Sequence, residues 1–223
     1  EQWQPHDRIT LIGGVGFDHY SDIGEQFSPK IASVFRLNAQ RSAIRRHILK
    51  IQYGRAFRPP TFLETQAASN TSNSKPETID TFELSYITRK FDETLRFTAF
   101  ISKLDACITG ISCHQEAYDI KGFELEYEKP LFPDILDLDA NLSYARTENR
   151  DTGDEISGSA NWLSNIGITY RPFRWMSFSL RLHSVFDRNR DMLAAANDPE
   201  DTHLLDATAF LRYPGNRKWT LRF

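Results

Sequence analysis

The chain has 223 residues, a formal net charge of −3 and 26% charged residues, so it lacks the strongly basic surface that a nucleic-acid-binding protein carries. Its mean hydropathy is −0.49, and no run of about 18 apolar residues could cross a membrane as a helix. Its length suits one large all-β domain, and 13% of its residues are aromatic.

Apolar and polar residues alternate along most of the chain, which predicts strands with one apolar and one polar face. In the first of them, Ile9, Leu11, Val15 and Phe17 share one side. The glycines at 13–16 do not predict a phosphate-binding loop, because no helical pattern follows them. Strands are expected at 7–20, 28–37, 47–57, 78–88, 95–101, 120–128, 136–144, 162–170, 176–183, 204–212 and 217–223.

The clearest alternation lies at 136–144, where Leu138 and Leu142 alternate with Asp137 and Asp139. Such an acidic face does not fit a packed core but fits the water-filled lumen of a membrane barrel. Together with Glu124 and Glu126 it forms an acidic ladder. A hydrated wall is the preferred interpretation over a metal site, since hard cations need six or more convergent oxygens.

The connections between strands alternate between long polar loops and short turns. The long loops are expected at about 58–77, 105–116, 147–160 and 187–201. Outer-membrane barrels have long extracellular loops and short periplasmic turns. The pattern therefore places these loops outside the cell, where ligand contacts are expected.

Residues that could carry chemistry are few. Cys107 and Cys113 could form a small disulfide or stay free thiols. Cys113-His114 with Glu116 could bind a soft metal, but structural zinc usually takes four protein ligands. His183 and Ser179 share a face but lie about 13 Å apart along a strand, too far for catalysis. No catalytic constellation, cofactor or metal site is therefore expected, and the chain is not expected to be an enzyme.

Several segments resemble the TonB-dependent outer-membrane receptors. A strand ends Tyr53-Gly-Arg-Ala-Phe-Arg-Pro-Pro-Thr-Phe62 and returns, after a loop, as Lys75-Pro-Glu-Thr-Ile-Asp-Thr-Phe-Glu-Leu-Ser-Tyr86. The stretches 18–35 and 122–126 are similar to segments at matching places in the family. The terminal Phe223 resembles the signal that the barrel assembly machinery reads.

The resemblance implies an antiparallel transmembrane β-barrel in the outer membrane of a Gram-negative bacterium. Residues 1–223 would form the C-terminal portion, a partial barrel of about 11–12 strands out of about 22, without the plug domain. The implied function is TonB-coupled uptake of a ferric siderophore, haem or cobalamin. Arg55, Arg58, Arg181 and His183 are the lumen or loop candidates for ligand contacts. For Arg55 and Arg58 a structural role at the strand end is the preferred interpretation, and the alternative is that they face the lumen and contact the plug or an anionic ligand. The implied partners are lipid, the TonB complex and the assembly machinery.

The chain end does not fit this orientation. The strand at 204–212 descends toward the periplasm, and the last strand should descend too. A segment of roughly 20–40 residues, one spanning strand with its loops, is therefore expected to be absent near 212–213. Two alternatives stay open: a self-contained small barrel acting as a passive pore or enzyme, and a soluble all-β binding module.

Overall fold

A computed structural model describes residues 1–21, 23–37, 45–61, 76–109, 114–156, 159–189, 201–212 and 218–222. The side chains of 106–109, 114–115 and 218–222 are not described. The strands in the described part of the chain are β1 (Gln2–His6), β2 (Ile9–Tyr20), β3 (Gly24–Arg36), β4 (Arg45–Arg58), β5 (Glu77–Lys90), β6 (Glu93–Thr109), β7 (His114–Phe132), β8 (Leu136–Asn149), β9 (Ala160–Phe173), β10 (Met176–Arg188), β11 (Thr202–Arg212) and β12 (Lys218–Arg222).

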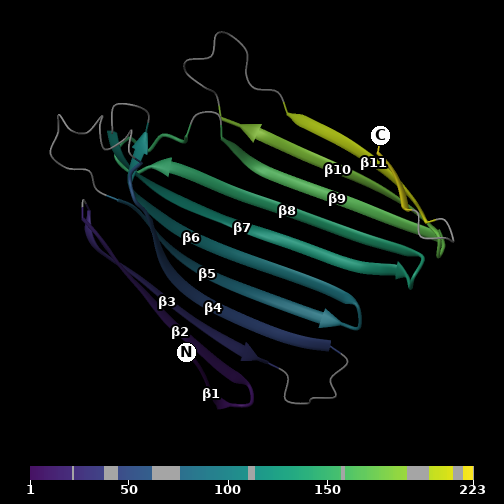
Figure 1. Ribbon diagram of the computed structural model, residues 1–223, viewed down its shortest axis with the longest axis horizontal. Coiled ribbons are helices and arrows are strands. Elements are labelled where there is room, and N and C mark those ends of the chain that lie inside the picture. Colours follow the sequence, from purple (N-terminus) through teal and green to yellow (C-terminus); the bar gives the residue numbers. More distant parts are fainter. Residues whose placement is uncertain are drawn as a thin grey trace, which may run out of the picture.

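These strands form one curved antiparallel sheet in which each strand pairs with its neighbours in sequence (Figure 1). Strands β1 and β12 are the two edges, and they do not pair with each other, so the sheet is not closed. Among the described residues, no helix is long and apolar enough to span a membrane. The antiparallel all-β prediction and the partial barrel are confirmed.

Burial in this sheet is the reverse of that in a globular core. The buried side chains of the described residues are mostly polar, and only Ala32 and Tyr118 are buried and apolar. Leu138 and Leu142 are half-buried among their neighbours, while Phe178 and Leu182 are 39% and 36% exposed. No second layer covers the apolar face, which excludes a sandwich of two packed sheets for the described strands.

Two strand boundaries differ from expectation. Strand β1 was not predicted; Trp3 pairs with Leu11 of β2, and Pro5 is tolerated because the strand lies at an edge. Strands β6 and β7 run through most of the loop expected at 105–116, with only 110–113 outside the described residues. The loop-side ends of β6 and β7 lack a clear alternation of apolar and polar residues. The sequence pattern therefore stops before the strands end.

The last strand also differs in direction. Strand β12 pairs antiparallel with β11, from Thr208 opposite Arg222 to Arg212 opposite Lys218. It therefore runs opposite to the descending direction expected from the aromatic end. The predicted absence of a segment near 212–213 falls at residues 213–217, which lie outside the described residues, as does Phe223.

The outward orientation of the apolar face predicts the effect of a buried charge. Leu180 lies on this face near the middle of β10, whereas Ser143 lies on the polar face of β8 opposite Glu124. In the full-length protein folded in lipid vesicles, Leu180→Arg should lower the free energy of unfolding by about 2–4 kcal/mol, because the guanidinium would lie in hydrocarbon. Ser143→Arg is the matched control and should change it little. Denaturant titration measures both, and equal losses would contradict the assignment of faces.

Candidate functional site

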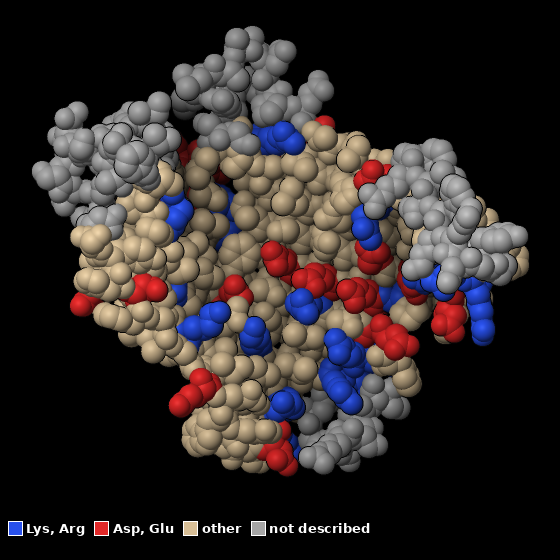
Figure 2. Space-filling view, viewed as in Figure 1, with Lys and Arg blue, Asp and Glu red and all other residues tan. Residues whose placement is uncertain are grey.

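The candidate site is the polar face of the sheet, which faces the lumen of the barrel that the strands would complete. Figure 2 shows acidic and basic side chains intermingled across the middle of the face in view. Most carboxylates of the acidic ladder on this face have a basic partner on another strand.

Three members of the ladder are paired with arginines from other strands. Arg96 of β6 donates to Glu126 of β7 at 2.9 Å. Arg171 of β9 pairs with Asp137 of β8, and Arg181 of β10 lies 3.4 Å from Asp139. Glu124 has no ion pair in the described part of the chain. The basic partners were missed because cross-strand neighbours depend on register, which the periodicity alone does not supply.

The Arg181–Asp139 pair spans an intervening strand. Asp139 lies opposite Gly167 of β9, and Gly167 lies opposite Arg181 of β10. A Cβ on Gly167 would lie 2.5 and 2.6 Å from the two carboxylate oxygens of Asp139. The absence of a side chain at Gly167 therefore leaves room for the carboxylate to lie across β9 toward the guanidinium.

A chain of hydrogen bonds crosses the same wall next to this ion pair. Asn165 donates from Nδ2 to Oδ1 of Asn141 at 2.7 Å and contacts Nδ1 of His183 through its own Oδ1. Nε2 of His183 lies 3.4 Å from Oδ2 of Asp206. Four strands, β8 to β11, are thereby joined on the lumen side.

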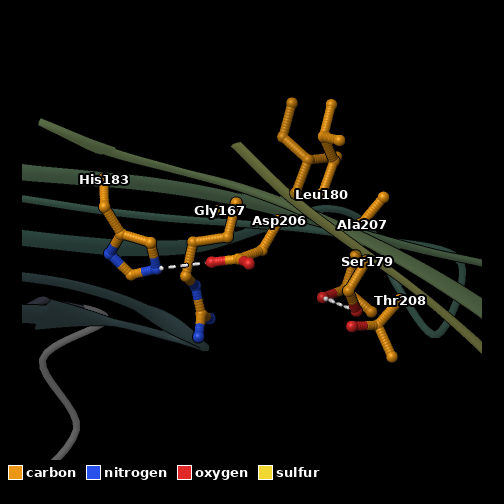
Figure 3. Close-up of a pocket in the computed structure, with 10 residues that line it drawn as sticks. Gly167, Ser179, Leu180, His183, Asp206, Ala207 and Thr208 are labelled. Carbon is orange, nitrogen blue, oxygen red and sulfur yellow. Dashed lines mark hydrogen bonds and ion pairs between the residues drawn. The ribbon is translucent and has the colours of Figure 1, made fainter. Parts of the chain in front are cut away.

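His183, Asp206 and Arg181 border a cavity of about 430 Å³ in the lumen wall. Figure 3 shows His183, Asp206, Ser179 and Thr208 extending from one side of the sheet and Leu180 from the other. Thr169 and Ser179 bond across the strands at 3.1 Å. The cavity thus offers a cation, an imidazole, a carboxylate and hydroxyl groups to a polar solute, and it contains the predicted candidates Arg181 and His183.

A second lumen-side cavity of about 560 Å³ lies over β4 to β7. Its floor is built from cross-strand hydroxyl pairs, Thr81 with Ser102 at 2.9 Å and Ser85 with Thr98 at 3.0 Å. Lys50, Arg96, Glu83, Glu124 and Glu126 also line it. Hydroxyl pairs satisfy one another and stay short, so they let the sheet remain polar without projecting charge into the lumen.

The other two candidates, Arg55 and Arg58, lie on opposite faces. Arg58 shares the lumen face and pairs with Glu77. Arg55 shares the outward face with Ile51 and Tyr53, and it donates to both oxygens of Asp80, at 2.9 and 2.6 Å. The alternative in which both arginines face the lumen therefore does not fit Arg55, whose bonds to Asp80 agree with the preferred structural role at the strand end. The sequence did contain a signal for this face, because Arg55 is two residues from Tyr53 and residues two apart on a strand share a face.

Aromatic residues mark two levels on the outward face. At the loop end, Phe123, Tyr144, Trp162 and Phe186 stand in one row across β7 to β10, and we call these four the upper aromatic row. The centroids of Tyr144 and Trp162 lie 4.7 Å apart. At the short turns, Phe91, Phe132, Phe173 and Trp175 are exposed. Aromatic girdles at both water interfaces are typical of outer-membrane barrels.

Beyond the upper aromatic row, the loop between β8 and β9 is fastened by Glu155. Its carboxylate accepts from Asn161 Nδ2 at 3.1 Å and from Arg146 Nε at 2.7 Å. These contacts lower the pKa of the Glu155 carboxyl below its ordinary value, the bond from Asn161 contributing most. Asn189, which follows β10, donates its backbone N–H to the carbonyl of Ser159 at 2.8 Å. The loop base is thus tied to the neighbouring hairpin.

Several predicted features cannot be placed. Cys107 lies in β6, but its side chain and the whole of Cys113 lie outside the described residues, so the disulfide stays a prediction. The same holds for the metal-site hypothesis at 113–116.

Sequence reasoning also missed a serine–histidine pair: Ser184 Oγ lies 2.9 Å from His203 Nδ1 on the outward face. Within the described residues, His203 has no carboxylate partner, which a catalytic triad would need.

A family model described as TonB dependent receptor-like, beta-barrel, matches residues 1–223. The chain belongs to this family. TonB-dependent receptors are an outer-membrane family of Gram-negative bacteria, and the family that the motifs at 53–62 and 75–86 indicated is confirmed. No curated protein matches the chain in sequence at a significant level.

Solved receptor structures share the fold. The ferric enterobactin receptor PfeA of Pseudomonas aeruginosa matches with a TM-score of 0.77 and 18% identity over 96% of this chain and 36% of its own. The copper transporter OprC matches at 0.75 with 16% identity, over 98% and 39%. The ferric yersiniabactin receptor FyuA of Yersinia pestis matches at 0.71 with 16% identity, over 94% and 36%. This TonB-dependent receptor chain therefore spans less than half the length of these receptors.

The close approach at Gly167 predicts a steric effect of substitution. In the full-length receptor, Gly167→Val should lower the free energy of unfolding by about 1–3 kcal/mol, because the new side chain would displace the Asp139 carboxylate. The control is Gly13→Val in β2, where a Cβ would have nothing within 4 Å and the change should stay within about 0.5 kcal/mol. Equal effects at the two glycines would show that Gly167 leaves no needed room.

The lowered pKa of Glu155 predicts a pH-dependent loop. The ionised carboxylate stabilises the loop base, so this contribution is full above the ordinary value of 4.5 and is lost as pH falls through the lower folded pKa. Amide protection factors at 150–156, corrected for intrinsic exchange at each pH, should drop in that range. Glu155→Gln removes the titration and should give low protection at every pH. An unchanged transition in this variant would assign it to another group.

Proposed function

We propose that the chain forms part of the barrel wall of an outer-membrane receptor that takes up a metal chelate, most simply a ferric siderophore, with energy from the TonB complex. The observation that supports this most strongly is the family match over the whole chain. A second supporting observation is the single-layer sheet, whose apolar face has no protein partner among the described residues. Two of the similar structures are ferric siderophore receptors and a third is a copper transporter.

The edges of the sheet support the proposal that this is a part of a larger barrel. Unpaired backbone groups at β1 and β12 would be costly in lipid, because no water is present to satisfy them. The chain covers 36–39% of the chains of the similar receptors. We infer that further strands of the full receptor pair with both edges, and that its plug domain lies against the lumen wall.

The lumen wall suits passage of a polar solute. Because arginines neutralise Glu126, Asp137 and Asp139, the wall offers many hydrogen-bonding groups without a strong local charge that would hold an ion tightly. Arg181 and His183, at the cavity of about 430 Å³, are the residues we propose for contact with the solute or the plug. Arg58 remains a lumen candidate, while Arg55 lies outward and could act only through the loops.

Uptake in cells tests this function. A strain whose own receptors are deleted, and which expresses the full-length receptor, should accumulate radioactive iron from at least one siderophore of a panel. Uptake should fall to background when tonB is deleted or the proton gradient is collapsed, since the barrel supplies no energy. TonB-independent uptake that rises linearly with concentration would instead identify a passive pore, and conductance of the receptor in liposomes would confirm the pore.

A further inference from the structure

Two basic residues lie just beyond the upper aromatic row on the outward face. Lys121 precedes Phe123 by two residues on β7, and Arg146 follows Tyr144 by two residues on β8, so each shares the face of its aromatic neighbour. They stand directly opposite each other in the β7–β8 ladder. The first charges above the aromatic row on these strands are therefore both positive.

Like charges directly opposite each other destabilise a sheet unless an anion lies between or near them. Arg146 has such partners, Glu148 at 2.8 Å and Glu155 at 2.7 Å. Lys121 faces Ile101 on its other side, is exposed, and has no ion pair within the described residues. Asp119 and Glu148 lie one step farther toward the loops, so Lys121 is open from the membrane side.

The level of Lys121 in the barrel matches the lipid headgroups. Phe123 and Tyr144 lie roughly ten residues from the turn that joins β7 to β8, about 33 Å along the strands, or about 25 Å along the axis of a barrel with strands tilted by about 40°. That is the height of the apolar band of an outer-membrane barrel. Lys121 and Arg146 are one step above it.

We propose that Lys121, with Arg146 beside it, binds a phosphate group of an outer-leaflet lipid. Lysine binds phosphate as a compact point charge, and basic residues next to a membrane surface attract anionic headgroups. Lys103 of β6, which lies diagonally next to Lys121 on the same face, extends the site. The aromatic row below would contact the acyl chains and the glycerol or sugar level of the same lipid. The inference does not depend on which solute the receptor takes up.

The test measures lipid bound to the full-length receptor in detergent. Delipidated receptor is mixed with phosphorylated lipid A, and bound lipid is counted by native mass spectrometry. Lys121→Gln should weaken binding at least about fivefold, and Lys103→Gln combined with it should weaken it further. The control is Lys30→Gln on the lumen face of β3, which should bind as the parent does. Arg146 is left intact because it fastens the loop through Glu155.

Two further arms separate the lipid from other anions. Dephosphorylated lipid A should bind the parent receptor as weakly as phosphorylated lipid binds the Lys121 variant. Inorganic phosphate should compete only at concentrations far above those of the lipid, because it lacks the acyl chains. Equal binding of both lipid forms, unchanged binding by the double variant, or displacement by phosphate as easily as by lipid would each overturn the proposal.

Discussion

The structure depends on one constraint: a single sheet has two faces and no second layer among the described strands, so each face must be matched to its own solvent. Alternation with a period of two assigns the side chains accordingly. Leu180 and Ile168 are exposed on one face, while the groups that pair most closely, such as Ser85 with Thr98, lie on the other. In a soluble protein this arrangement would be unstable. It is stable when the apolar face lies against hydrocarbon and the polar face lies against water.

The lumen face meets a different requirement, since a carboxylate there is hydrated yet close to its neighbours. Asp139 pairs with Arg181 across Gly167, where the intervening strand has no side chain. The missing side chain lets charges two strands apart interact. Such pairs are exposed and contribute little to stability singly. Their larger effect is to keep the wall nearly neutral, so that a polar solute finds hydrogen bonds without a deep electrostatic trap.

Much of the fold could be predicted from sequence because its signal is local. The stripe at Leu138 and Leu142 was readable from the residues alone, and the motif at 53–62 indicated the family. The partners of the acidic residues could not be predicted from sequence. Asp137 pairs with Arg171 because the register of β8 and β9 places them close together. The face of Arg55 could have been predicted from Tyr53, because residues two apart on a strand share a face.

The same reasoning explains why the strand ends on the loop side were harder to predict. Above the upper aromatic row both faces meet water, so the apolar-polar period that fixes register in the membrane is lost, and a slip by one residue would cost little burial. Opposite charges at facing positions provide an alternative there. Arg55 lies opposite Asp80, Asp80 opposite Lys103, and Lys103 opposite Asp119. A shift of any one strand would bring like charges together or leave them unpaired. The charges that look functional in sequence thus also hold the register of the strands where hydrocarbon no longer does.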